Sequence, residues 1–476
     1  MTTTKPTSRS RARTRTRKLA RAATIQSINP ATGDFVESFA ETSRRELDGI
    51  LDQSDRAFQD WRRRPWSERS RLLRVAAGVL RNQKSTYARA MALEMGKPLA
   101  QGEAEAEKCA TVCDYYAEHA EAFLEQQPRD LDGTASFVRF DPIGPVLAIM
   151  PWNFPFWQVF RFAAPALAAG NVGLLKHASN VTRCALLIEE VFRDAGFPEG
   201  VFRSLILRNS AVGDVIADAR VRAVTLTGSE LAGSAVAEQA GHHLKKTVLE
   251  LGGSDAFIVL ADADLARAAR TAADARLINS GQSCIAAKRF IVVDAVADRF
   301  EERFVAEMRS RVMGDPFAAG TDVGPQARVD LRTALHRQVQ QSVRRGARLA
   351  TGGAIPAGVG AFYPPTVLLG VRPGMPAFDE EVFGPAAAVI RARDEADAIR
   401  LANASPYGLG AAVWTEDRAR GRRIAAELDV GCVFVNALVR SDPRLPFGGV
   451  KRSGYGRELA EFGLREFVNI KSVAVA

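Results

Sequence analysis

Cysteine and long apolar runs are scarce in this sequence. The 476 residues include five cysteines, an odd number, and no two of them form a C-x-x-C pair. Neither a disulfide framework nor a zinc site is predicted, and we expect no bound metal. No uninterrupted apolar stretch approaches the roughly 20 residues that a transmembrane helix needs, so no membrane segment is expected. The apolar core of a secretory signal is also absent, which favours a reducing, cytoplasmic location.

Acidic residues are absent from the first 23 positions, where eight basic residues account for most of the net charge of +9. This Arg-, Ser- and Thr-rich composition indicates a disordered tail over residues 1–23. A targeting signal is the alternative, but the apolar stripe of such a helix is missing. No aromatic residue precedes Phe35, so base stacking is unavailable and binding of nucleic acid would be sequence-blind. We expect no specific nucleic-acid partner, and a nucleic-acid-associated protein is the alternative of a different class.

The length predicts two domains, because a single core stops growing at roughly 250 to 300 residues. From about residue 43 to 126 apolar residues recur three and four apart, as in helices. Short apolar runs then alternate with helical segments, which predicts βαβ units and mostly parallel sheets. We place the first domain at 24–252, the second at 253–440 and a C-terminal segment at 441–476. That segment ends in an alternating strand, which needs an edge to pair with, and in an oligomer this edge can belong to a neighbouring subunit.

One cysteine stands among small residues in "GQSCIAAKR". A thiol becomes a nucleophile when its thiolate is stabilised and its approach is open. Around Cys284, the residues Gly281, Ser283 and Ala286 leave room for a substrate and for backbone N–H donors. The alternative is a small buried hydrophobe, which is our interpretation of the other four cysteines, Cys109, Cys113, Cys184 and Cys432.

Four further motifs carry chemically useful residues. Glu250 in "LELGGSD" is either a helix cap or a general base that swings on the glycines after it. Asn153 in "PWNFP" is either part of a rigid turn or an amide donor to an oxyanion. Gly228 in "AVTLTGSELAG" lacks the G-x-G-x-x-G pattern, but its turn would let phosphates approach a helix N-terminus. Lys176 in "GLLKHASN" suits a ribose or a phosphate, or is simply solvated.

Taken in order, these motifs resemble the aldehyde dehydrogenase superfamily over residues 25–476. The resemblance rests on "PWNFP", "GLLKHAS", "TLTGSE", "LELGGSD", "GQSC", "EEVFGP" and "PFGGVKRSGYGRE". It implies an α/β fold with a Rossmann-type cofactor domain, an α/β catalytic domain and a β arm for oligomerisation, to which residues 134–148 contribute. It also implies a homodimer or homotetramer.

The resemblance also implies a reaction. The segments "LLKHASNV" and "LPFGGVKRSGYGREL" look like those of bacterial succinate-semialdehyde dehydrogenases. The expected activity is therefore NAD(P)+-dependent oxidation of an aldehyde to a carboxylic acid, with succinate semialdehyde as the first candidate.

Individual roles carry over from the resemblance. Cys284 would attack the aldehyde, and Glu250 would activate the water that cleaves the resulting thioester. The Asn153 amide would bind the oxyanion together with the Cys284 backbone N–H. Glu381 would hold the nicotinamide ribose and Phe383 would pack near the ring. The full cofactor site would comprise Trp152, Asn153, Lys176, Ser179, Gly228, Ser229, Glu230, Leu251, Glu381 and Phe383. A non-catalytic scaffold is the remaining alternative, and the joint presence of Cys284, Glu250 and Asn153 argues against it.

Ser179 bears on the choice between NADP and NAD. Many NAD-dependent relatives carry a glutamate three residues after the lysine, where its charge repels a 2′-phosphate. The hydroxyl of Ser179 and the ammonium of Lys176 can instead both favour that phosphate. We expect NADP or NAD as cofactor, with NADP favoured.

The substrate prediction depends on two residues. Arg161 stands where succinate-semialdehyde dehydrogenases carry an arginine, and its guanidinium fork suits a carboxylate. Ser441 could add a hydroxyl. An ion pair with an acid on its own helix is the alternative for Arg161, and Ile278 replaces a second arginine of some relatives. Trp157 and Phe156 suit an aromatic or longer aldehyde, which is the alternative substrate.

Overall fold

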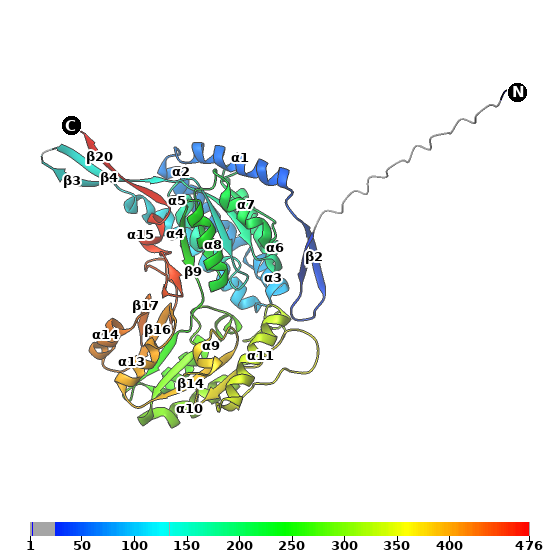
Figure 1. The fold of residues 1–476 in the computed structure, drawn as a ribbon, viewed down its shortest axis with the longest axis vertical. Coiled ribbons are helices and arrows are strands. Elements are labelled where there is room, and N and C mark those ends of the chain that lie inside the picture. The colour runs from blue at the N-terminus through cyan, green and yellow to red at the C-terminus, as the bar shows by residue number, and fades with distance from the viewer. Residues whose placement is uncertain (1, 3–23, 133, 476) are drawn as a thin grey trace.

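The computed structural model describes residues 2, 24–132 and 134–475. The tail predicted over residues 1–23 lies, apart from residue 2, outside the described residues. The described chain folds into two α/β bodies, and a β arm projects from the first of them (Figure 1).

The first body is built on a six-stranded sheet. Its strands follow the order β19-β9-β8-β5-β6-β7, and all neighbours are parallel except β19 and β9. The strands are β5 (Pro145–Met150), β6 (Val172–His177), β7 (Phe202–Ser204), β8 (Ala223–Thr227), β9 (Lys246–Glu250) and β19 (Gly454–Tyr455). Every residue of β6 and β8 is buried. Such strands have both faces covered by helices, as parallel sheets require.

The predicted helical region at 43–126 is confirmed. It forms α1 (Arg44–Trp61), α2 (Trp66–Asn82), α3 (Lys84–Met95) and α4 (Leu99–Phe123). Ser43 begins α1 with a reciprocal capping box to Glu46, and Gly96 ends α3 in the left-handed conformation. The helices after them in this body are α5 (Trp157–Ala168), α6 (Thr182–Asp194), α7 (Val212–Ala217), α8 (Glu230–His242) and α15 (Ala460–Arg465).

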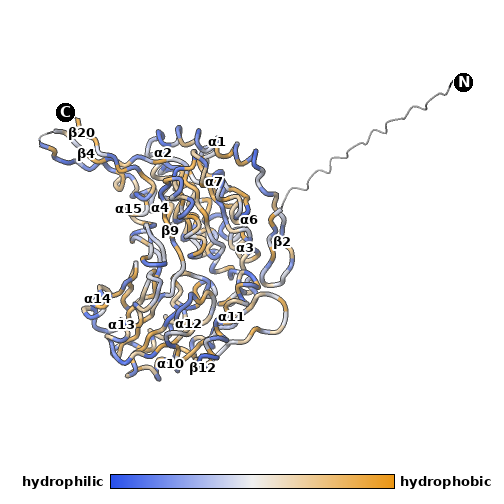
Figure 2. Tube along the Cα trace, in the orientation of Figure 1, coloured by the Kyte–Doolittle hydropathy of each residue, from blue (hydrophilic) through white to orange (hydrophobic). Residues whose placement is uncertain are grey.

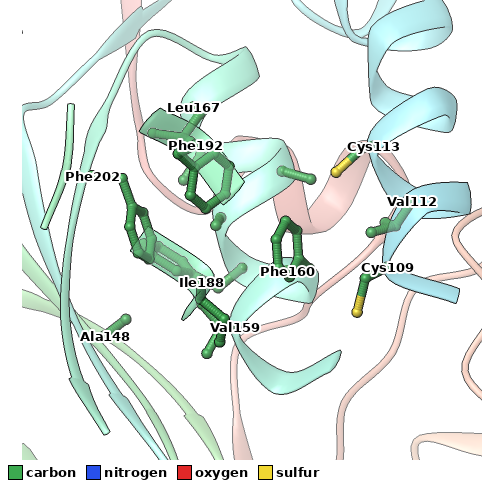
Figure 3. Packing of buried hydrophobic residues seen from close by; sticks show 14 of the residues in the cluster. Cys109, Val112, Cys113, Ala148, Val159, Phe160, Leu167, Ile188, Phe192 and Phe202 are labelled. Atoms are coloured by element: carbon green, nitrogen blue, oxygen red, sulfur yellow. The ribbon is translucent and has the colours of Figure 1, made fainter. Parts of the chain in front are cut away.

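The core of the first body lies where α4 packs against α5. Cys109 and Cys113, one turn apart on α4, face Phe160 of α5, and all three side chains are fully buried (Figure 3). Cys184 is also buried, as expected, whereas Cys432 is only half-buried. The prediction of a fully buried thiol is therefore wrong for Cys432, because β17 lies at the edge of its sheet.

The second body is built on a seven-stranded sheet of order β12-β13-β14-β11-β10-β16-β17, antiparallel only between β12 and β13. Its strands are β10 (Ala256–Val259), β11 (Arg289–Val293), β12 (Arg348–Thr351), β13 (Thr366–Leu369), β14 (Ala386–Ala392), β16 (Gly410–Trp414) and β17 (Cys432–Val435). Its helices are α9 (Leu265–Leu277), α10 (Asp294–Arg309), α11 (Val329–Arg344), α12 (Pro376–Asp379), α13 (Glu395–Asn403) and α14 (Arg418–Glu427). Apolar segments concentrate on the strands, whereas outer helices such as α1 are mostly polar (Figure 2).

The chain crosses between the bodies and then returns. It leaves the first sheet after β9 and enters the second at β10. After β17 it comes back through β18 (Val450–Lys451), which pairs with β15 (Tyr407–Gly408), and through β19 beside β9. Two segments therefore connect the bodies: residues 251–255, and the segment that returns after β17.

The arm is a three-stranded antiparallel sheet of β20 (Val468–Val475), β4 (Thr134–Pro142) and β3 (Gln127–Leu131). The C-terminal strand therefore finds its predicted partner edge in its own chain. The segment 134–148, assigned to the arm from the sequence, divides between β4 of the arm and β5 of the six-stranded sheet. A separate hairpin, β1 (Thr24–Ile28) with β2 (Phe35–Ala40), lies at the start of the described region. Among the described residues, no helix is long and apolar enough to cross a membrane.

Candidate active site

A crevice between the two bodies collects eight of the predicted residues. It encloses about 220 Å³, and both sheets supply its walls. The first body contributes Trp152, Asn153, Gly228, Ser229 and Leu251, and the second contributes Cys284, Glu381 and Phe383. The rings of Trp152 and Phe383 meet edge to face, with 5.7 Å between their centres.

Two further hollows adjoin this crevice. A long cleft of about 610 Å³ contains Lys176 and Ser179 and shares Gly228 with the crevice. A small cavity of about 110 Å³ shares Gln158 and Cys284 with the crevice. Cys284 therefore lies between the crevice and the small cavity, and the crevice continues into the long cleft, whose volume falls in the range of roughly 300 to 1,000 Å³ that ligand sites enclose.

A tight turn presents the Cys284 thiol. Asn279, Ser280 and Gly281 have positive φ angles of 52°, 56° and 76° in succession. A Cβ at Gly281 would lie 2.3 Å from the carbonyl carbon of Gly384, so only glycine fits there. Left-handed non-glycine residues are costly and persist where the surrounding contacts hold them, often at functional sites.

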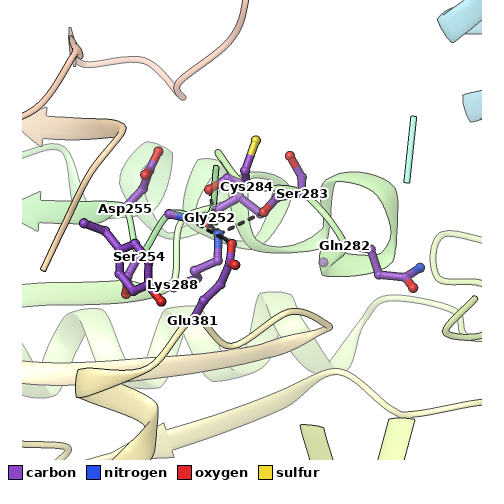
Figure 4. Close-up of polar contacts among 12 residues, drawn as sticks. Gly252, Ser254, Asp255, Gln282, Ser283, Cys284, Lys288 and Glu381 are labelled. Atoms are coloured by element: carbon purple, nitrogen blue, oxygen red, sulfur yellow. Dashed lines mark hydrogen bonds and ion pairs between the residues drawn. The ribbon is translucent and has the colours of Figure 1, made fainter. Parts of the chain in front are cut away.

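Side-chain hydrogen bonds hold this turn in place. Asn153 Nδ2 donates to the carbonyl of Gln282 at 3.0 Å, and Asn279 Nδ2 donates to the carbonyl of Asn153 at 2.5 Å. Lys288 Nζ donates to the carbonyls of Ser283 (2.9 Å), Cys284 (2.7 Å) and Ala286 (3.1 Å) (Figure 4). The thiol points away from Lys288 in that view. The loop is thus tied to Asn153 on one side and to a buried ammonium on the other.

The thiol is protonated in this environment. Burial raises the pKa of Cys284 to about 12, although the positive charges of Arg161 and Lys288 act to lower it. A reaction through this sulfur therefore needs a base that accepts the thiol proton.

Glu250 is a buried carboxyl group whose two oxygens have no hydrogen-bond partner among the described residues. Burial raises the pKa of Glu250 well above its usual value, and the nearby Glu458 raises it further, while Arg161 lowers it. Glu250 lines neither the crevice nor the small cavity. The structure places Glu250 at the end of β9, with its carboxylate towards Gly448, and not in the hollows that Cys284 lines.

Lys288 also connects the cysteine loop with Glu381. Its Nζ lies 3.6 Å from Glu381 Oε1, which accepts a hydrogen bond from the Gly253 N–H at 3.0 Å. Burial raises the pKa of Glu381, and Lys288 counteracts this. The carboxylate that faces the crevice is thereby fixed to the loop that carries the thiol.

The long cleft holds two further predicted residues, Lys176 and Ser179. Lys176 Nζ donates to Asn209 Oδ1 at 2.5 Å, and burial lowers the pKa of this lysine. Ser229 caps α8, so the N-terminus of this helix opens near the junction of cleft and crevice. Glu230 lines neither hollow, because its carboxylate accepts from the Tyr407 hydroxyl and pairs with Arg452 at 3.4 Å.

The small cavity contains both residues predicted to bind the substrate, Arg161 and Ser441. Arg161 forms a buried ion pair with Glu458, and its guanidinium lies 4.7 Å from the centre of the Phe447 ring. The alternative of an acid on the same helix is wrong, because Glu458 comes from the C-terminal segment. Trp157 lines this cavity, whereas Phe156 is fully buried and packs on Tyr87.

Several residues of the site were not predicted from the sequence. Lys288 stands in the quoted cysteine loop, directly before a strand, and its position there was a usable signal. Glu458 lies in "GRELAEF" with no feature that marks it as the partner of Arg161. Lys108, on α4, also lines the small cavity, and nothing in its helical context sets it apart. Among the described residues, no cluster of three or more His, Cys, Asp or Glu side chains could hold a metal ion.

The parallel sheets and the crevice with its long cleft define an oxidoreductase of the dinucleotide-dependent α/β class. The chain belongs to the aldehyde dehydrogenase family, whose sequence profile matches residues 18–473. It is therefore an enzyme that oxidises an aldehyde.

Individual relatives agree with this assignment. The chain is 48% identical to a probable succinate-semialdehyde dehydrogenase [NADP(+)] of Synechocystis sp., over 95% of this chain and the whole of that protein. It is also 48% identical to the succinate semialdehyde dehydrogenase [NAD(P)+] Sad of Escherichia coli, over 94% and 97% of the two chains. Among solved structures, a succinic semialdehyde dehydrogenase from Streptococcus pyogenes in complex with NADP+ superposes with a TM-score of 0.93 at 37% identity, covering 95% and 99%. The structure of Gox0499 gives a TM-score of 0.94 at 41% identity, covering 95% and 100%.

Proposed function

We propose that this enzyme oxidises succinate semialdehyde to succinate, with NADP+ as the preferred cofactor and NAD+ as the alternative. The observation that carries this proposal is the small cavity, which Cys284, Arg161 and Ser441 line together. With the aldehyde carbon at the sulfur of Cys284, the distal carboxylate of the substrate would lie at Arg161 and Ser441. The names of the relatives in Synechocystis, Escherichia coli and Streptococcus pyogenes point to the same substrate.

The long cleft fits a dinucleotide phosphate. It offers a buried lysine with only an amide oxygen as partner, a serine hydroxyl three residues on, and a helix N-terminus close by. In this proposal Lys176 and Ser179 hold the 2′-phosphate, Ser229 and Glu230 lie at the helix end near the pyrophosphate, and Glu381 binds the nicotinamide ribose. These residues would hold NADP+, which would supply the hydride acceptor.

The residues around that site would include the crevice wall of Trp152, Asn153, Gly228, Leu251 and Phe383. We assign dinucleotide binding to residues 24–252 and catalysis to residues 253–440, with a C-terminal segment at 441–476. This division is supported by the end of β9 at Glu250, the start of β10 at Ala256 and the return of the chain after β17.

The thiol of Cys284 would form a bond with the aldehyde carbon. As the S–C bond forms, the thiol proton passes to water and leaves to solvent, and the carbonyl oxygen becomes an oxyanion. Asn153 Nδ2 has one hydrogen on the Gln282 carbonyl and one left for this oxyanion, together with the Cys284 N–H. Loss of hydride from the carbon restores the C=O bond and leaves a thioester.

Glu250 would then act as the general base of hydrolysis. Its carboxylate takes a proton from water as the water oxygen attacks the thioester carbon, and the C–S bond breaks to release the acid. This role needs a rotation of Glu250 towards the crevice, for which the flexible Gly252 and Gly253 follow after Leu251, and apo geometry does not exclude such a base. The partnerless oxygens support it, since no structural hydrogen bond must be broken first.

Arg161 provides the test of the substrate assignment. Arg161→Ala is expected to lower kcat/KM for succinate semialdehyde by about one to two decades, because a charge-assisted hydrogen bond is worth roughly 1.5 to 3 kcal/mol. Butanal, of equal length but without the carboxylate, should lose far less. Arg161→Ala alone leaves the carboxylate of Glu458 buried without its partner. The double variant Arg161→Gln/Glu458→Gln removes both charges of the buried pair and therefore serves as the folding control. An equal loss of kcat/KM for both aldehydes would contradict the assignment of Arg161 to the substrate carboxylate.

Ser179 provides the test of cofactor choice. Ser179→Glu should shift the ratio of kcat/KM values for NADP+ and NAD+ towards NAD+ by about tenfold or more, because the new carboxylate repels the 2′-phosphate. Ser179→Gln is the uncharged control of similar size. A native preference for NAD+ that Ser179→Glu leaves unaltered would contradict this assignment.

We also infer a homodimer or homotetramer in a reducing, cytoplasmic setting. The arm supports the oligomer, since its strands expose apolar side chains such as Leu131 (53% exposed), Ile470 (63%) and Val475 (59%). The unpaired thiols suit a reducing compartment. Sedimentation of the native enzyme beside a variant lacking residues 468–476 tests the role of the arm.

A further inference from the structure

The small cavity contains a second cation besides Arg161. Lys108, on α4, lines it together with Cys284 and Ser441. Its Nζ donates a hydrogen bond to Ser441 Oγ at 2.7 Å and lies 4.1 Å from the centre of the Trp157 ring. These two contacts hold the ammonium at the cavity wall, at the same part of it as the serine hydroxyl.

The ammonium of Lys108 has no carboxylate partner within 4.0 Å in the described part of the chain. The acids nearest to it along the helix and in the adjoining loop are paired elsewhere: Glu105 with Lys97, Glu107 with Arg81 at 2.8 Å, and Asp442 with Arg444 at 2.8 Å. By contrast, the guanidinium of Arg161 is already matched by Glu458. The uncompensated positive charge of this cavity wall therefore belongs to Lys108.

The protonated form of Lys108 is the one present near pH 7. Burial lowers the pKa of Lys108 to about 8, and the positive charge of Arg161 lowers it as well. The side chain of Lys108 is half-buried, and a desolvated cation without a carboxylate partner is unfavourable, so an anion that enters the cavity relieves this cost. An uncharged aldehyde would leave the cost in place.

We propose that Lys108, together with Ser441, binds the distal carboxylate of the aldehyde and so determines the specificity of the enzyme for acidic substrates. This inference rests on the proposed function. Arg161 still donates hydrogen bonds to the carboxylate, but Glu458 balances its charge, so the net charge that attracts the substrate comes from Lys108 on α4. A cavity of about 110 Å³ places any carboxylate within it close to both the thiol and this lysine.

The test compares two aldehydes on three variants. Lys108→Met keeps the aliphatic stem over Trp157 and removes the charge, and Lys108→Arg keeps the charge. Lys84→Met is the matched control, since Lys84 is an exposed lysine on the neighbouring helix α3 whose ammonium lies 3.7 Å from Glu103. For each protein, kcat and KM are measured with succinate semialdehyde and with butanal, and succinate binding is measured by the shift in Tm.

Lys108→Met is expected to raise KM for succinate semialdehyde about tenfold or more and to weaken the Tm shift with succinate, while kcat/KM for butanal stays within about twofold. Lys108→Arg should retain most of the preference, and Lys84→Met all of it. If Lys108→Met lowers kcat/KM equally for both aldehydes, Lys108 only supports Trp157 and Ser441, and the inference is wrong.

The same data separate this inference from the proposed function. A native enzyme that prefers succinate semialdehyde, with a preference that Lys108→Met leaves unchanged, overturns the role of Lys108 alone. A native enzyme without that preference overturns both. Lys108→Gln replaces Lys108→Met if the latter has no cooperative unfolding transition.

Discussion

Replacing Cys284 with alanine is expected to lower aldehyde oxidation by at least roughly 10⁴-fold, since removing a catalytic nucleophile costs this much or more. The variant should still bind NADP+, because Lys176 and the N-terminus of α8 lie in the long cleft and not at the thiol. Reduced cofactor is followed by its absorbance with succinate semialdehyde, and NADP+ binding by the shift in Tm.

The matched control for this variant is Cys432→Ala. Cys432 is a half-buried thiol in the second body whose sulfur lies 3.5 Å from the carbonyl of Leu409, and it lines neither the crevice nor the small cavity. Its loss should leave activity unchanged. Residual oxidation by Cys284→Ala at more than about a hundredth of the native rate would contradict the nucleophilic role.

Glu250→Gln is expected to uncouple the two halves of the reaction. Thioester hydrolysis should slow by roughly 10² to 10⁴-fold, the usual contribution of a positioned general base. Mixing this variant with substrate and NADP+ should then give a burst of up to one reduced cofactor per active site, followed by a slow steady rate. Steady turnover of Glu250→Gln at the native rate would show that another group activates the water.

The pH profile gives the same residue a second test. Burial raises the pKa of Glu250, so the carboxylate that acts as base becomes populated at a higher pH than an exposed carboxylate would. The native steady rate should therefore increase with pH through this raised pKa and level off above it. Glu250→Gln has no such group, and its slow steady rate should lack this rise. An identical rise in both proteins would assign the profile to a different group.

The sequence predicted the elements of the site better than their contacts. Cys284, Asn153 and Glu381 were found because each lies in a short motif that, taken in order with the others, resembles the aldehyde dehydrogenase superfamily. The structure brings them to one crevice, as the alternation of strands and helices implies for parallel sheets. For Glu230, the pattern "TGSE" marks the helix start but does not show that Tyr407 and Arg452 engage its carboxylate.

Contacts between residues that are far apart in the sequence could not be predicted, for a physical reason. The Arg161–Glu458 pair joins residues from α5 and the C-terminal segment, and Lys108 meets Ser441 across 333 positions. Helical periodicity reports which face of α4 is buried, but it cannot say that one lysine at the edge of that face reaches a cavity. The packing of α4 against α5, which carries Trp157 and Arg161, places the ammonium of Lys108 in the small cavity that Cys284 also lines.

The substrate preference of the native enzyme tests the account most directly. Steady-state kcat/KM is measured for succinate semialdehyde and for butanal with saturating NADP+ at pH 7. The cavity lined by Lys108, Arg161 and Ser441 predicts a ratio of at least about ten in favour of succinate semialdehyde, the equivalent of one charge-assisted hydrogen bond. A ratio of one or below would contradict the account.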